Sequence, residues 1–186
     1  MKRPRFLLHP SRSFFLTTSL VLAASLPVQG NYFDVPEGET VTVFTPLSGD
    51  SGLTKDGGGT LVLEAKNIYT GTTTVNAGEL KVSGSTAEVW HAGDNLNVHG
   101  TLTLENQGRF GANNGLVTAA DGAVVNVSGS SNFVLAGDLT VGDQGGRGEV
   151  NFSDGGYGTV VKNLYLGRDA GSTGTLSLDS LSSTLS

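Results

Sequence analysis

Short runs in which every second residue is apolar recur along most of this chain. The runs at 60–64, 79–83 and 101–105 are three of them, and Gly, Asn, Asp or Ser residues separate one run from the next. Alternation with a period of two places the apolar side chains on one face of a strand, and such runs between turn residues are typical of half-buried strands. After residue 30 no helical periodicity is found. The sequence therefore predicts an all-β fold.

The runs also repeat at a spacing that suits a solenoid. Residues 139–143 resemble residues 164–168 at an offset of 25, and residues 148–152 resemble residues 174–178 at an offset of 26. A β-sandwich would not require glycines to recur at matching places, whereas the tight corners of stacked coils favour Gly and Asn. We predict a right-handed parallel β-helix of roughly six to eight coils.

The alternation also predicts which side chains face the interior of the solenoid. We expect one continuous apolar column, because inward residues of successive coils stack directly on one another. Its predicted members are Leu61, Leu63, Val75, Leu80, Val82, Leu102, Leu104, Val150, Phe152, Leu164, Leu166, Leu176 and Leu178.

The first thirty residues have the pattern of a secretory signal. Four basic residues precede an apolar run at 14–26, and Val28 and Gly30 supply the small residues before a cleavage site. The run is shorter than the about 20 residues needed to cross a bilayer. We predict a signal peptide at 1–30, a mature chain that starts near Asn31, and no membrane span in that mature chain.

Cleavage of this signal would leave a strongly acidic protein. Seven Lys and Arg and all seventeen Asp and Glu would remain, which gives a net charge of −10. Such a surface repels nucleic acid, so we exclude nucleic-acid binding. The chain has no cysteine, so its stability in an oxidising compartment must come from burial and backbone hydrogen bonds.

The segments LTKDGGGTLVL at 53–63 and NIYTGTTTV at 67–75, followed by the strand at 79–82, resemble the autotransporter-associated β-strand repeat. We place this repeat at 53–84. Ile68 stands where a threonine is usual, which does not disturb the order of strand, turn and strand. The resemblance implies an exported passenger region.

A second resemblance covers the last fifty residues. LGRDAGSTGTL at 166–176 and SSTLS at 182–186 resemble a repeat of type V secretion passengers and exosortase-sorted surface proteins, with Leu185 in place of the usual aromatic residue. We predict two tandem copies at 137–186. Residues 31–52 are interpreted as lead-in strands and residues 85–136 as degenerate coils that match neither repeat.

These families imply a translocator barrel or a membrane anchor after the repeats. The sequence stops at Ser186 with neither, and we interpret the chain end as truncated. The last coil, from Leu176 to Leu185, carries alternating leucines and Asp179 as its one charge. Because an unguarded strand edge is a template for another chain, we expect self-association through this open end, and we expect a lysine at Leu178 or Ser183 to reduce it.

Several residues could carry chemistry, but each of them also has a simpler structural interpretation. His91 and His99 with Asp94 between them lack a third metal ligand at a fixed spacing, so we interpret them as surface residues beside a partly buried Trp90. Residues 145–150 lack the aspartate that a calcium-binding nonapeptide repeat needs, and we interpret them as a corner turn.

Two acidic residues at matching repeat positions raise a separate question. Asp143 and Asp169 could stack and hold a calcium ion, but we favour solvated acids in turns. Parallel β-helices include polysaccharide lyases, which cluster acids beside an Arg or Lys. Here the acids are scattered, and Arg147 and Arg168 fall in predicted turns.

We therefore predict a secreted or surface-displayed structural or adhesive β-helix stalk without enzymatic activity. No catalytic, cofactor or metal residue is predicted. The partner is expected to be an extracellular ligand, either carbohydrate or protein. The alternative is a β-helical polysaccharide lyase or another carbohydrate-active enzyme, which would need acids clustered in a cleft on one face.

Overall fold

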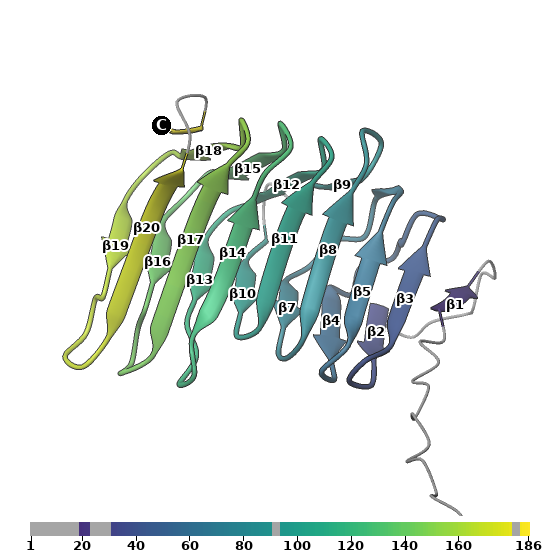
Figure 1. Ribbon diagram of the computed structural model, residues 1–186, viewed down its shortest axis with the longest axis horizontal. Coiled ribbons are helices and arrows are strands. Elements are labelled where there is room, and N and C mark those ends of the chain that lie inside the picture. The colour runs from purple at the N-terminus through teal and green to yellow at the C-terminus, as the bar shows by residue number, and fades with distance from the viewer. Residues whose placement is uncertain (1–18, 23–30, 91–93, 180–182) are drawn as a thin grey trace, which may run out of the picture.

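The computed structural model describes residues 19–22, 31–90, 94–179 and 183–186, and within these ranges every regular element is a strand (Figure 1). The strands form three sheets, called A, B and C here. Sheet A contains β1 (Ser19–Leu22), β3 (Thr40–Val43), β5 (Thr60–Leu63), β8 (Glu79–Ser83), β11 (Thr101–Glu105), β14 (Ala123–Val127), β17 (Arg147–Ser153) and β20 (Thr173–Asp179). Sheet B contains β2 (Asn31–Asp34), β4 (Leu53–Asp56), β7 (Thr73–Val75), β10 (Leu96–Val98), β13 (Gly115–Val117), β16 (Leu139–Val141) and β19 (Leu164–Leu166). Sheet C contains β6 (Lys66–Asn67), β9 (Glu88–Trp90), β12 (Arg109–Ala112), β15 (Asn132–Leu135), β18 (Tyr157–Val160) and β21 (Thr184–Leu185).

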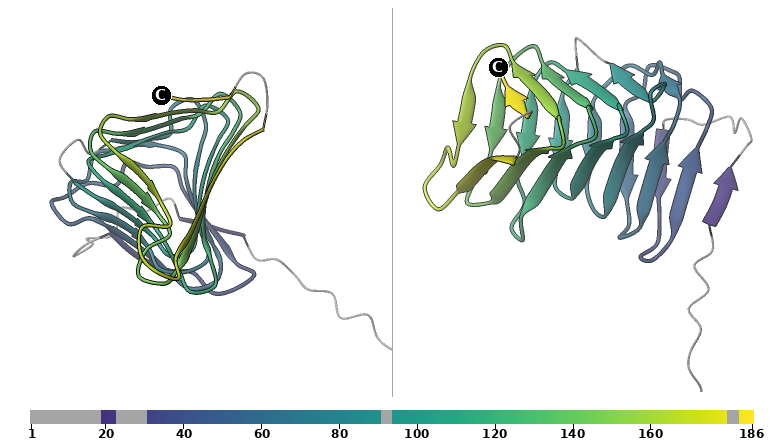
Figure 2. Two further views of the ribbon diagram at one scale, coloured as in Figure 1. Left: turned by 90° about the vertical axis from the view of Figure 1, so that its left-hand side faces the viewer. Right: turned by 45° about the horizontal axis from the view of Figure 1, so that its top comes forward.

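From β4 onward the chain visits the sheets in the fixed order B, A, C and so winds into a β-solenoid of about 6 turns. Every strand pairs in parallel with the strand one turn earlier or later, as β8 does with β5 and β11. The end-on view in Figure 2 shows the three sheets enclosing one interior. The predicted all-β solenoid is confirmed. The strands β9 to β15, which lie in the segment 85–136 that matches neither repeat, pair in parallel with the strands of neighbouring coils.

The recurring glycines mark places where neighbouring coils approach too closely for a side chain. Gly148 and Gly174 are register partners at the start of β17 and β20. A Cβ atom on Gly148 would lie 2.1 Å from the carbonyl oxygen of Val117, and one on Gly174 would lie 2.1 Å from that of Val141. The glycine repeat in the sequence therefore reflects a repeated contact between the corner before sheet A and the strand of sheet B.

The interior is the apolar column that the alternation predicts. Nine of the thirteen predicted residues, from Leu61 to Phe152, are fully buried. The other four lie in the last coil: Leu164 and Leu176 are half-buried, whereas Leu166 and Leu178 are 45% and 53% exposed. They keep the register of the column, but no further strand covers them in the described residues. The predicted register is therefore confirmed, and the exposure is confined to one end.

The predicted signal peptide lies largely outside the described residues, in 1–18 and 23–30. Its remaining segment, β1, pairs in parallel with β3 at the edge of sheet A (Figure 1). Cleavage after residue 30 stays a prediction. Among the described residues there is no helix long and apolar enough to cross a membrane.

Candidate functional site

A column of polar residues follows the corner where the chain leaves sheet B for sheet A. His99, Thr118, Asp143 and Arg168 occupy this corner in four successive coils. Nδ1 of His99 lies 2.8 Å from the carbonyl oxygen of Thr118, and the Thr118 hydroxyl donates to the carbonyl oxygen of Asp143 at 3.0 Å. Arg168 Nη2 then donates to Asp143 Oδ2 at 2.8 Å. We call these four residues the corner column.

Asp143 is the unusual member of the corner column. Its side chain is 3% exposed, and its second carboxylate oxygen, Oδ1, is buried without a hydrogen-bond partner. Our interpretation of Asp143 and Asp169 as a pair of solvated acids is therefore wrong for Asp143, although Asp169 is exposed. The coil that carries Arg168 stacks directly on Asp143 and excludes solvent from it. The Arg168 guanidinium then supplies the positive charge that a calcium ion would supply in the alternative interpretation.

A second polar column runs along the corner before sheet B. Asn95, Asn114, Asp138 and Asn163 each directly precede a strand of that sheet. The Asn114 amide donates to Asn95 Oδ1 at 3.2 Å, and the backbone N–H of Asp138 donates to Asn114 Oδ1 at 2.9 Å. Asn163 donates to Asp138 Oδ1 through its side chain at 2.9 Å. We call this set the amide column, and its bonds tie consecutive coils together.

A groove lies over sheet B between the two columns. Its volume is about 430 Å³, and the outward residues of three neighbouring strands form its floor: Asn97 of β10, Leu116 of β13 and Thr140 of β16. Asn95, Asn114 and Asp138 line one side, and Asp143, Gln144 and Arg168 line the other. A second hollow of about 240 Å³, lined by His99, Thr118 and Gly146 among others, also reaches Asp143. Asp143 thus borders both hollows.

The residues considered for a metal site are not brought together as one site. His91 lies outside the described residues, and His99 is exposed and faces a backbone carbonyl. Asp94 Oδ2 accepts from the backbone N–H of Gly71 at 2.7 Å. Trp90 is 43% exposed, more than predicted, and the guanidinium carbon of Arg109 lies 5.8 Å from the centroid of its ring. Within the described ranges no three His, Asp or Glu side chains gather as metal ligands would.

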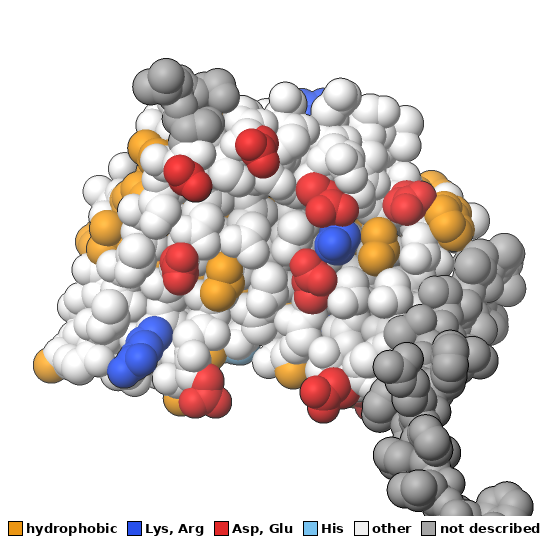
Figure 3. All heavy atoms as spheres, viewed as in Figure 1, with side chains coloured by type: hydrophobic (Ala, Val, Ile, Leu, Met, Phe, Trp, Pro, Cys, Tyr) orange, Lys and Arg blue, Asp and Glu red, His pale blue; other side chains and the backbone are white. Residues whose placement is uncertain are grey.

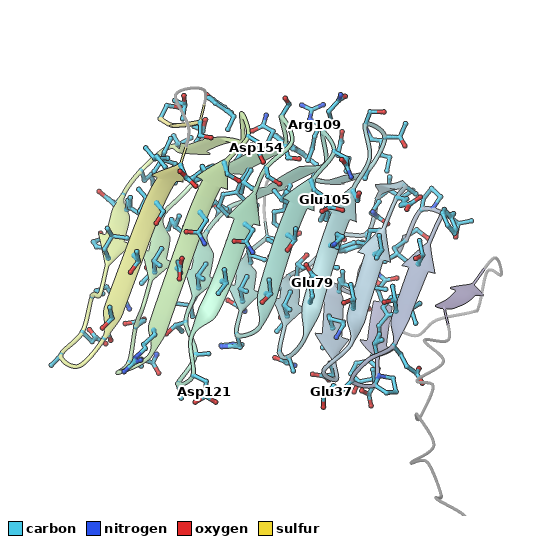
Figure 4. The ribbon with its side chains drawn as sticks, viewed as in Figure 1. Glu37, Glu79, Glu105, Arg109, Asp121 and Asp154 are labelled. Atoms are coloured by element: carbon cyan, nitrogen blue, oxygen red, sulfur yellow. The ribbon has the colours of Figure 1, made fainter. Side chains whose placement is uncertain are left out.

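The acidic residues are distributed along the solenoid. Figure 4 labels Glu37, Glu79, Glu105, Asp121 and Asp154, which lie on different coils, and Figure 3 shows acidic side chains scattered over the sheet A face. Residues 144 and 145 form a turn, but residues 147–150 belong to β17, so the corner-turn interpretation of 145–150 is wrong for most of that segment and Arg147 lies in a strand. The visible face therefore presents no compact group of carboxylates.

Residues 53–82 match the family model described as the passenger-associated-transport-repeat. The matched segment is similar to this repeat. It contains β4, β5, β6, β7 and most of β8, one full turn of the solenoid and the beginning of the next. The match overlaps the repeat that the sequence pattern predicts at 53–84, and it confirms the resemblance to an autotransporter passenger with repeats.

A curated relative is similar over a longer stretch. The chain is 34% identical over 110 residues to a protein of Serratia marcescens named "Extracellular serine protease". The alignment covers 59% of this chain but only 10% of the relative, so the chain spans a small part of that protein's length. No solved structure matches the chain.

Proposed function

We propose that this chain is a structural and adhesive stalk module of a secreted or surface-displayed protein. The observation that carries the proposal is the passenger-associated transport repeat within a continuous β-solenoid. Stacked coils transmit load through strand-to-strand hydrogen bonds and form an extended surface, which suits a spacer that also contacts partners. The N-terminal basic, apolar and small residues support export by a signal peptide, and the name of the Serratia relative supports an extracellular location.

We propose no enzymatic activity for the chain itself. The acids are spread over many coils, and His99 faces a backbone carbonyl rather than a carboxylate or a serine hydroxyl. A lyase would need an acid cluster with a positioned base, and a serine protease would need a histidine between its nucleophile and an acid. The alignment covers only 10% of the Serratia relative, which is too little to assign that protein's activity to this chain.

The stalk proposal predicts that the chain is a rigid rod and that it cleaves no polysaccharide or protein substrate. Seven strand positions at about 4.8 Å give a solenoid about 30 Å long. Small-angle scattering of the exported chain should fit this rod, and mass spectrometry should place its N-terminus near Asn31. Pectin, alginate and casein should remain uncleaved when they are incubated with it. Turnover that is lost on mutation of a single Asp or Glu would refute the non-enzymatic proposal.

The mature chain, which is predicted to start near Asn31, should also associate through its last coil. β20 forms the edge of sheet A, and Leu178 on it is 53% exposed. Because the acidic surface repels other copies, association should increase with salt in sedimentation experiments. Leu178→Lys should reduce it, whereas Val62→Lys on the outward face of β5 should not. A wild type that stays monomeric at high salt would contradict this prediction.

A further inference from the structure

Asp143 lines the groove between the corner column and the amide column, and one of its carboxylate oxygens is buried without a hydrogen-bond partner that the stalk role would supply. Oδ1 of Asp143 is buried without a partner, while Oδ2 is held by Arg168 at 2.8 Å. A buried carboxylate oxygen that lacks a donor costs stability, so its retention at the border of a groove is a reason to look for a ligand that donates to it.

We propose that this groove binds a short neutral oligosaccharide, with Asp143 accepting a hydrogen bond from a sugar hydroxyl. The inference rests on the proposed adhesive role for its biological setting and adds the site and the ligand class. Sugar hydroxyls both donate and accept hydrogen bonds. The groove matches this property, because its amide, hydroxyl and carboxylate groups include both donors and acceptors.

The floor of the groove supports the same ligand class. Asn97 and Thr140 point outward because their strand neighbours face the core, and Leu116 between them adds a half-buried apolar surface. Tyr165 is the register partner of Thr140 on β19 and is 37% exposed. The polar groups suit the hydroxyl-bearing edges of pyranose rings. The apolar side chain and the neighbouring aromatic ring suit the apolar faces of those rings.

Other ligand classes fit the groove less well. A divalent cation at Asp143 would face the Arg168 guanidinium, and in the described part of the chain no third acidic or histidine ligand completes a site. A peptide docked through apolar side chains would need deeper apolar pockets than the single half-buried Leu116 supplies.

The test is calorimetric titration of the purified exported chain with cellohexaose, maltohexaose and N-acetylchitohexaose, and separately with calcium chloride. At least one of the three sugars should bind with a dissociation constant at or below about 1 mM. Asp143→Asn and Asn97→Ala should each weaken that binding by at least about tenfold. Asp169→Asn removes an exposed carboxylate one residue beyond Arg168 and should leave affinity unchanged.

Thermal unfolding of each variant separates binding from folding. Should Asp143→Asn unfold because the Arg168 ion pair is lost, Asn97→Ala decides the result, since Asn97 faces outward from the core. No sugar binding up to about 10 mM overturns the inference, as does binding that survives both groove variants or a site that takes calcium alone. These results leave the stalk proposal standing, because its rod shape and its lack of turnover are measured independently.

Discussion

Lys55→Met is expected to destabilise the solenoid by about 3 to 5 kcal/mol, far more than any other lysine substitution in the described residues. Lys55 lies inside the solenoid on β4 and is fully buried. Its ammonium group donates to the carbonyl oxygens of Asp56 at 2.7 Å, Gly57 at 2.8 Å and Ala77 at 3.2 Å. Methionine fills a similar volume but leaves these three acceptors without their charged donor.

The arrangement also explains why a lysine and three glycines stand near the start of the segment that matches the passenger-associated-transport-repeat. Gly57 has a left-handed backbone with a φ of +75°, and a Cβ there would lie 2.1 Å from the carbonyl oxygen of Val35. The glycine turn therefore directs its carbonyls inward, and Lys55 binds them together with a carbonyl of the next coil. Burial lowers the pKa of Lys55, and the charges of Asp56 and Asp34 oppose that shift.

Chemical denaturation followed by circular dichroism measures this effect. The matched control is Lys66→Met, because the Lys66 side chain is 67% exposed and pairs with Glu88 at 3.1 Å on the surface. Exposed pairs of this kind contribute about 1 kcal/mol or less. If Lys55→Met lowered the free energy of unfolding no more than the control does, the three carbonyl oxygens would be satisfied without the ammonium group.

Alternation was sufficient to predict the strands and the inward side chains, because these depend on neighbours within one strand, and the repeat offsets of 25 and 26 added the parallel solenoid. Lys55 was missed although the same alternation places it inward with Leu53, since a charged residue is not expected in a core. Asp143 was misjudged for a different reason. Its burial depends on Thr118 one coil earlier and Arg168 one coil later, contacts between coils that the alternation within one strand does not reveal.

The groove was not predicted at all, although its parts were visible. The segments at 139–143 and 164–168 were aligned at an offset of 25, and that alignment places Asp143 opposite Arg168 on successive coils. Opposite charges at one strand spacing attract, so the alignment itself contained the signal for an ion pair. The amide column gave a weaker signal, since asparagine before a strand is also common in ordinary turns.

Phe133→Ala is expected to cost about 3 to 5 kcal/mol, because it removes a large ring from a fully packed interior. Phe133 on β15 is fully buried, and its ring centroid lies 6.2 Å from that of Phe110 one coil earlier. Phe44→Ala is the matched control, because Phe44 is 49% exposed. This substitution should lower the free energy of unfolding by less than about 1 kcal/mol.

Phe133→Ala should also change the cooperativity of unfolding, because Phe133 lies in a coil between other coils of the solenoid. Each coil contacts only its neighbours, so a weakened coil in the middle separates the coils before it from those after it. Phe133→Ala should therefore lower the slope of the unfolding free energy against denaturant concentration and broaden the unfolding transition. A change at the exposed end, such as Leu178→Ala, should leave the slope and the width of the transition nearly unchanged. A single sharp transition of unchanged slope for Phe133→Ala would show that the coils unfold as one unit, and that coupling along the rod extends beyond neighbouring turns.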